Sequence, residues 1–151
     1  MTGRLLGPGL YGLARLRVGD RIETGTCAVS AAKIDAFAEL TGDRFEIHMD
    51  AEAARRRGFA GRVAHGLLVL SLVDGLKNQT PAQFDAVASL GWDWTFAAPV
   101  LAGEVIRATL TVTALRASSK TDRGIATLDL VVTGQDGGTV QRGVNRLMIR
   151  G

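Results

Sequence analysis

The sequence has very little cysteine and no long apolar run. Its single cysteine, Cys27, excludes a disulfide within the chain and a cysteine-based metal site. The two histidines are not spaced as metal ligands along the chain, so we predict no metal site. The longest apolar run, Leu67–Val73, is far too short to cross a bilayer, and glycine and proline interrupt the start of the chain, unlike a signal peptide. These absences predict a cytoplasmic protein with no membrane partner.

Aromatic residues are also few, at 5%, whereas 46% of residues are hydrophobic, so we expect an aliphatic core. A length of 151 residues fits one domain, 1–151. The formal charge of +3 is mildly basic, and basic residues cluster only at Arg55–Arg57. Nucleic-acid-binding chains usually carry a basic stripe interleaved with aromatic residues, which this sequence lacks. We therefore expect an anionic small molecule as partner, and no nucleic acid.

The first part of the chain predicts an irregular start, a strand region and a helix. Residues 1–16 show little periodicity and several glycines, which predicts an irregular lead-in. Residues 17–29 alternate weakly and predict a strand pair or one bent strand. Ser30 is a suitable N-cap for a helix whose apolar residues recur at helical spacing, and Gly42 suits its C-terminal end.

Two further helices are predicted in the middle of the chain. Asp50 is a suitable N-cap for a short helix, Ala51–Arg57, closed by Gly58. The next helix runs from Gly66 to about Asn78 and is apolar on most sides. A helix with so little polar surface is expected to be buried.

The second half of the chain predicts strands. The aromatic residues of the run 92–96 share one face, and residues 105–114 alternate between polar and apolar. Two more strands, 124–133 and 139–149, are separated by a Gln-Asp-Gly-Gly turn signal. An early strand, then helices, then several antiparallel strands indicate an α+β fold.

Two side chains that follow Gly42 are the best candidates for chemistry. Asp43 and His48 lie five residues apart, so if the chain bends back they can hold one water between them. Judged from the residues alone, Thr-Gly-Asp is also an ordinary helix end and a lone histidine is usually structural. Gly66 opens the apolar helix, whose first N–H groups lack partners and suit a carbonyl oxygen that gains negative charge. The alternative for Gly66 is that it lets the helix pack closely.

The motifs around these residues resemble one enzyme family. The pattern Gly-Asp-x-Phe-x-x-His-x-Asp over 42–50, followed by Arg-Val-Ala-His-Gly over 62–66, resembles the MaoC-like enoyl-CoA hydratases of the hot-dog superfamily. Residues 96–100, 103–104 and 112–116 look like three further landmarks of that family. The resemblance covers nearly the whole chain. It implies a single hot-dog domain, in which an antiparallel sheet wraps around a buried central helix.

The resemblance also implies three catalytic residues. Asp43 would orient and deprotonate a water that adds to the β-carbon of a trans-2-enoyl thioester, and His48 would share the hydrogen bonding of that water. The backbone N–H of Gly66 would polarise the thioester carbonyl. Many relatives carry Asn-Pro where this chain has Phe45-Glu46, which puts the usual acyl-chain preference in doubt. Phe45 is predicted to contact the substrate.

Four more residues are predicted to bind the substrate or to support the site. His65 is expected chiefly to hold the loop through a local hydrogen bond. Ser71 and Asp74 lie about one turn apart on the buried helix, and Asp74 either needs a buried partner or meets solvent near the helix end. Arg62, like Arg55–Arg57, could bind the phosphates of coenzyme A, although arginines on a short helix usually form a solvated face.

The resemblance predicts a hydratase or dehydratase that reversibly adds water to a 2-enoyl-CoA and gives, by analogy, an (R)-3-hydroxyacyl product. Coenzyme A enters as part of the acyl-CoA thioester substrate, and no other cofactor is expected. Hot-dog domains generally pair their sheets, so a homodimer or an assembly of dimers is predicted. Two alternatives stay open. One is a hot-dog thioesterase that directs water to the carbonyl carbon, and the other is a non-catalytic subunit that binds acyl-CoA or a partner.

Overall fold

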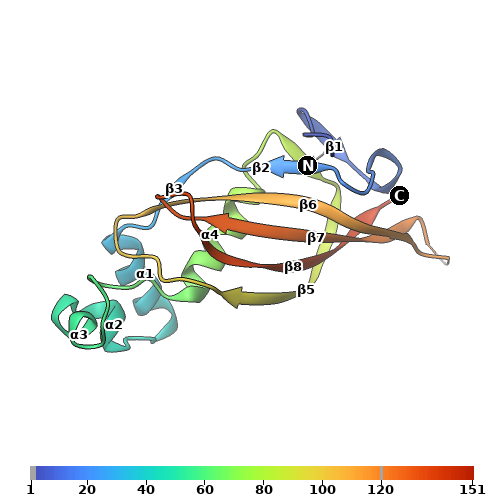
Figure 1. Ribbon diagram of the computed structural model, residues 1–151. Coiled ribbons are helices and arrows are strands. Elements are labelled where there is room, and N and C mark those ends of the chain that lie inside the picture. Colours follow the sequence, from blue (N-terminus) through green and yellow to red (C-terminus); the bar gives the residue numbers. More distant parts are fainter. Residues whose placement is uncertain (1–2, 120) are drawn as a thin grey trace.

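A long antiparallel sheet and one helix packed on its face make up most of the computed structural model, which describes residues 3–119 and 121–151 (Figure 1). The strands lie in the order β2-β6-β7-β8-β5, and β3 also pairs with β6. Their bounds are β2 Arg21–Glu23, β3 Cys27–Ala28, β5 Ala86–Phe96, β6 Val105–Ala117, β7 Arg123–Thr133 and β8 Thr139–Arg150. At one end of this sheet lie the helices α1 Ala31–Thr41, α2 Glu46–Met49 and α3 Ala51–Arg56.

The helix boundaries follow local capping signals. In α1, Ala31–Thr41, the Ser30 side chain accepts the N–H of Lys33, and Gly42 ends the helix in the left-handed conformation at φ 79°. In α3, Ala51–Arg56, the Asp50 side chain accepts the N–H of Glu52. All three of these predicted caps, Ser30, Gly42 and Asp50, are confirmed. A further short helix, α2, spans Glu46–Met49 and was not predicted, because one turn is too short to show a helical period.

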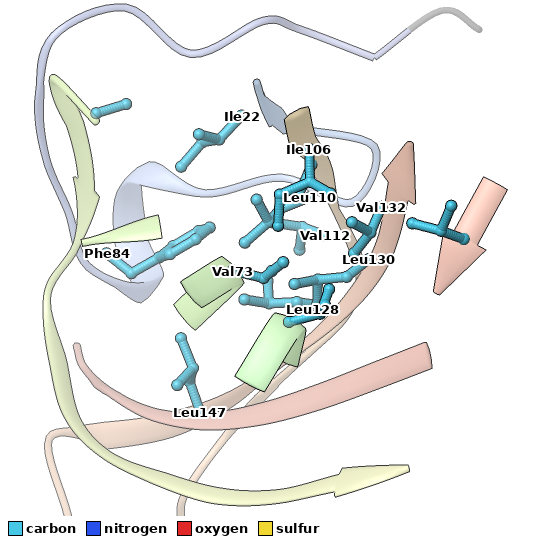
Figure 2. Close-up of a cluster of buried hydrophobic side chains, with 14 of the residues drawn as sticks. Ile22, Val73, Phe84, Ile106, Leu110, Val112, Leu128, Leu130, Val132 and Leu147 are labelled. Atoms are coloured by element: carbon cyan, nitrogen blue, oxygen red, sulfur yellow. The ribbon is translucent and has the colours of Figure 1, made fainter. Parts of the chain in front are cut away.

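The apolar helix is α4, Gly66–Lys77, close to the predicted bounds. Its buried side packs on the sheet, and Figure 2 shows Val73 among the sheet residues Leu128 and Leu130. The other side is open, since Leu67 is 59% exposed and Ser71 is exposed. The prediction that α4 is buried on most sides is therefore wrong for this face, because within one chain the sheet covers only one side of the helix.

The N-terminal segment is more ordered than predicted. β1, Gly9–Tyr11, pairs in parallel with β4, Ala82–Phe84, and a 3-10 turn, η1, spans Leu13–Arg15. Arg4 donates two hydrogen bonds to the buried carboxylate of Asp20, at 2.7 and 2.6 Å. The lead-in that the sequence predicts to be irregular thus contains a strand whose partner lies far along the chain.

The core is aliphatic, as predicted. Leu110, Leu128 and Leu130 are fully buried between the sheet and α4 (Figure 2). The predicted alternation of β6 is confirmed as far as Val112, where a bulge interrupts the pairing with β7. None of the helices in the described ranges has the length and hydropathy needed to cross a membrane.

Candidate active site

Asp43 lies in the exposed loop that leaves α1. The left-handed Gly42 turns the chain, and the backbone N–H of Asp43 donates to Thr41 Oγ1 at 3.2 Å. One carboxylate oxygen, Oδ1, accepts the N–H of Phe45 at 3.2 Å. The carboxylate is thereby held at the start of α2 and remains exposed.

His48 comes from α2 and is only 8% exposed. Its Nδ1 lies 2.7 Å from the carbonyl oxygen of Val63. Because a carbonyl oxygen only accepts hydrogen bonds, Nδ1 carries the hydrogen, and Nε2 of the neutral ring keeps a lone pair. The fold therefore fixes both the tautomer and the orientation of this imidazole.

His65 directly precedes α4 and is 2% exposed. Its Nε2 donates to the backbone carbonyl of Asp43 at 2.9 Å, which confirms the predicted local hydrogen bond. Its ring stacks on that of His48, with centroids 4.0 Å apart and an interplanar angle of 27°. The buried Nδ1 of His65 has no hydrogen-bond partner among the described residues.

These contacts bring the three side chains together. A carboxylate oxygen of Asp43 and one ring nitrogen each of His48 and His65 all lie within 4.8 Å of one another. Such a trio can hold a metal ion, but Nε2 of His65 is already a donor and its Nδ1 is enclosed, so this ring offers no open lone pair. The arrangement suits a water between Asp43 and His48 better than a metal ion, and the absence of a metal site stays a prediction.

Gly66 is the first residue of α4, and no side chain caps this helix start. A Cβ at position 66 would meet the ring of Phe96 at 2.6 Å, so only glycine fits against this ring without a shift. The carbonyl of Gly66 accepts a hydrogen bond from Nε2 of Gln141 at 3.1 Å. Close packing at Gly66 is confirmed, and its N–H lies in the first turn of the helix, where N–H groups lack helical partners.

A cavity of about 390 Å³ adjoins His48 and Gly66. Gln141, on β8, is its other polar side chain. The rest of the lining is apolar apart from backbone: Ile47, Phe59, Val63, Ala64, Val69, Phe96, Ala97, Ala98, Pro99 and Val100. Gln141 was missed from the sequence. A polar residue on the inward face of an alternating strand was the signal that could have found it.

Phe45 and Arg62 lie at the edge of the cluster. Phe45 is 48% exposed and meets the His48 ring edge-on, at 6.1 Å between centroids. Arg62 donates from Nε to the carbonyl oxygen of His48 at 2.6 Å and from Nη2 to Asp35 at 2.5 Å. Arg62 therefore fastens the loop that carries His48, and its contact with a substrate phosphate stays a prediction.

Ser71 and Asp74 lie apart from the cavity beside Gly66. The Ser71 hydroxyl donates to the carbonyl of Leu67 at 2.8 Å and borders a different cavity, of about 430 Å³, next to Cys27. Asp74 forms an ion pair of 2.9 Å with the buried Lys77 and is 42% exposed. The two alternatives for Asp74 thus both hold in part, since it has a buried partner and meets solvent.

Two other features lie outside the cavity that adjoins His48 and Gly66. The side chains of Arg55–Arg57 form ion pairs with Glu46 and Glu52, as expected for a solvated face. A larger cavity, of about 510 Å³, lies at the opposite end of β8 beside Met148 and contains none of the predicted site residues. Cavity size alone therefore does not mark the site.

The chain matches known proteins along most of its length. A family model described as "MaoC like domain" matches residues 15–133. The (R)-specific enoyl-CoA hydratase of Aeromonas caviae is 36% identical over 107 residues, which cover 71% of this chain and 76% of that protein. The mitochondrial 3-hydroxyacyl-[acyl-carrier-protein] dehydratase of Arabidopsis thaliana is 34% identical over 101 residues, which cover 67% of this chain and 58% of that protein.

Solved structures share the fold. A protein from Archaeoglobus fulgius, described as a monoamine oxidase regulatory protein, has a TM-score of 0.87 at 28% identity and covers 96% of this chain and 98% of its own. The (R)-hydratase from A. caviae has a TM-score of 0.73 at 32% identity, covering 87% and 96%. A Mycobacterium tuberculosis protein with a double hot-dog fold has a TM-score of 0.81 at 20% identity, covering 93% and 44%. The predicted hot-dog fold is confirmed, and the chain belongs to the MaoC-like dehydratase family.

Proposed function

We propose that this protein is a hydratase/dehydratase that reversibly adds water to a trans-2-enoyl-CoA. The observation that carries the proposal is the approach of the Asp43 carboxylate and the His48 ring to within 4.8 Å, with His48 and Gly66 on the wall of one largely apolar cavity. The names of the relatives, an enoyl-CoA hydratase and a hydroxyacyl dehydratase, support the same reaction class.

The water lies between Asp43 and His48 in the proposed mechanism. One of its hydrogens points to the Asp43 carboxylate, and the other points to the lone pair of His48 Nε2, which the Val63 contact leaves free. The water oxygen forms a bond to the β-carbon of the enoyl group while Asp43 takes a proton from the water. That proton then moves to the α-carbon, so that the elements of water are added and the site returns to its starting state.

The thioester carbonyl receives the electron pair that leaves the double bond. Its oxygen gains negative charge, and the backbone N–H of Gly66 donates to it at the positive end of α4. Removal of one such donor typically costs about a hundred- to a thousand-fold in rate. The apolar wall of the cavity is the proposed site of the acyl chain.

A homodimer is proposed as the working form. Within the described residues, β5 pairs with β8 on one side, and its other edge has no strand partner. This edge strand carries exposed apolar side chains, with Val87 39% and Leu90 45% exposed. A long unpaired edge with apolar side chains suits pairing with a second copy of the chain.

The direct test is the loss of enoyl-thioester absorbance when the pure protein meets crotonyl-CoA and longer trans-2-enoyl-CoAs, with Asp43→Asn in parallel. Asp129→Asn is the matched control, because Asp129 lies between the inward Leu128 and Leu130 of β7 and so points away from α4. We expect hydration by the wild type and the control, and almost none by Asp43→Asn.

The same assay separates the two alternatives. Release of free thiol without loss of the double bond would support the thioesterase instead. Binding of acyl-CoA that is unaffected by Asp43→Asn, with no turnover of any enoyl thioester, would support the non-catalytic subunit. Chiral analysis of the 3-hydroxyacyl product tests the (R) assignment, which follows the name of the A. caviae relative.

A further inference from the structure

Gln141 is a buried polar side chain on the wall of the candidate active-site cavity. It is 2% exposed and lies on β8, where its neighbours in the cavity wall are mostly apolar. Burying an amide is costly unless its donor and acceptor groups are hydrogen-bonded. The partners of this amide therefore indicate what it does.

Both ends of the amide are used. Its Oε1 accepts the indole N–H of Trp94 at 2.8 Å, and its Nε2 donates to the carbonyl oxygen of Gly66 at 3.1 Å. The indole only donates and the carbonyl only accepts, so the amide can satisfy both partners in one orientation alone. Trp94, Gln141 and Gly66 thus form a hydrogen-bonded chain from the edge strand to the first residue of α4.

Gly66 needs support from outside the helix. Glycine has the widest backbone freedom of all residues, and the side chain of His65 at the N-cap bonds to the Asp43 carbonyl and not to the N–H groups of the first helical turn. Support comes instead from a facing pair on β5 and β8, since Phe96 is the register partner of Gln141. The Phe96 ring touches the glycine, and Gln141 bonds to its carbonyl oxygen.

We propose that Gln141 is a positioning residue that holds the Gly66 backbone so that the Gly66 N–H stays directed at the substrate carbonyl. This inference rests on the proposed function. The Gly66 N–H acts on charge that develops in the transition state, so misplacing it lowers kcat more than it changes KM. Trp94 acts one step further away, by fixing the amide of Gln141.

Two substitutions at position 141 test the proposal with different chemistry. Gln141→Glu keeps the size and the acceptor for Trp94 but faces the Gly66 carbonyl with an oxygen in place of a donor. Gln141→Met fills the same space without hydrogen bonds. We expect each to lower kcat about ten-fold, the loss typical of one neutral hydrogen bond, with KM changed less than about three-fold.

Asn145 provides a matched control on the same strand. It is fully buried, and its Nδ2 donates to Ser89 Oγ and to the Gly91 carbonyl, at 2.9 and 3.0 Å, rather than to α4. Asn145→Asp removes a comparable buried donor, so it should lower stability. The kcat of the folded protein should nevertheless stay within about two-fold of the wild type, because this amide has no contact with Gly66.

A spectroscopic measurement separates positioning from general loosening. A saturated acyl-CoA labelled with 13C at its carbonyl binds without reacting, and its infrared carbonyl stretch falls when a donor polarises it. We expect the lowered frequency in the wild type and in Asn145→Asp, and a return toward the value in water for both Gln141 variants. In Trp94→Phe the carbonyl frequency should return part of the way toward its value in water. In the double variant that combines Trp94→Phe with Gln141→Met, the frequency should differ little from that of Gln141→Met alone.

The outcomes are distinguishable. If the wild type hydrates enoyl-CoA but both Gln141 variants keep its kcat and its carbonyl frequency, the positioning role is overturned and the proposed function stands. If Asn145→Asp lowers kcat and the frequency shift as much as the Gln141 variants do, buried amides matter only for general stability, and the inference also fails. If the wild type has no hydratase activity, the proposed function and this inference fall together.

Discussion

The sheet and the loop region 42–66 are held together in different ways. In the sheet, Leu110, Leu128 and Leu130 are fully buried, and apolar packing is not directional. In the loop region, side chains bond to backbone carbonyls, as His48 does to Val63. Arg62 bonds in the same way to the His48 carbonyl, and His65 to that of Asp43. The sheet therefore supplies most of the stability, whereas a few directional hydrogen bonds in the loop region set the geometry of the site. Stability and activity should accordingly respond to different substitutions.

The largest effect is expected in the loop, and on activity alone. Asp43→Asn should lower kcat about a hundred- to ten-thousand-fold, because it removes the proposed base. Asp43 is exposed and asparagine can still accept the Phe45 N–H, so the free energy of unfolding should change by less than about 0.5 kcal/mol. Hydration rates and urea unfolding on one preparation check both statements. A matching loss of stability would contradict the separation of the two regions.

The sheet should show the reverse pattern. Leu128→Ala removes a fully buried side chain and should lower the free energy of unfolding by about 2–5 kcal/mol. The kcat of the molecules that remain folded should stay near the wild-type value, because Leu128 does not line the candidate active-site cavity. Urea unfolding and active-site titration measure the two quantities separately. Loss of kcat in fully folded protein would show that sheet packing also sets the site geometry.

Arg62 ties the loop region to α1 through directional bonds, so its loss should give a smaller effect on both stability and activity. Arg62→Met removes the bonds to the His48 carbonyl and to Asp35, so it should lower the free energy of unfolding by about 1–2 kcal/mol and lower kcat. Arg55→Met is the control, because Arg55 pairs with an exposed Glu52 and should change stability by less than about 0.5 kcal/mol. A rise in the KM for acyl-CoA with kcat unchanged would instead support the predicted phosphate contact of Arg62.

The smallest expected effect is a loss of stability in acid, through the ion pair of Asp20 and Arg4 in the N-terminal segment. Burial raises the pKa of Asp20, but hydrogen bonds from Arg4 and the Arg17 N–H, with the positive charge of Arg4, lower it overall below its ordinary 3.8. The folded protein thus binds fewer protons here than the unfolded chain, so this stabilisation is present above about pH 4 and is lost as the pH falls. Urea unfolding across acidic pH should show this loss in the wild type. In Asp20→Asn the corresponding part of the pH dependence should be absent.

Features coded by neighbouring residues could be predicted from the sequence. Ser30, Gly42 and Asp50 cap helices through bonds that span two to four residues, so their residue types suffice. The alternation of polar and apolar residues along β6 likewise predicts which of its faces is buried, because it depends only on neighbouring residues. The α+β order and the family motifs then fixed the expected architecture.

Features that depend on tertiary contacts could not be predicted. His48 and His65 are not at ligand spacing in the sequence, yet their rings stack because α2 and the start of α4 meet. Gln141 reaches Gly66 from a distant strand, and β1 finds its partner β4 far along the chain. The open face of α4 was missed because hydrophobicity alone does not tell which surface covers a helix.

The contact between Gly66 and the Phe96 ring also bears on how such a site can change over evolution. Because a Cβ on residue 66 would lie 2.6 Å from the ring, alanine at this position requires Phe96 to move or to be replaced by a smaller residue. The coupling runs one way, because a smaller residue at position 96 still leaves room for Gly66, whereas a side chain at position 66 requires Phe96 to move or to shrink. A lineage that changes this part of the cavity would therefore replace Phe96 first, and only then could position 66 accept alanine.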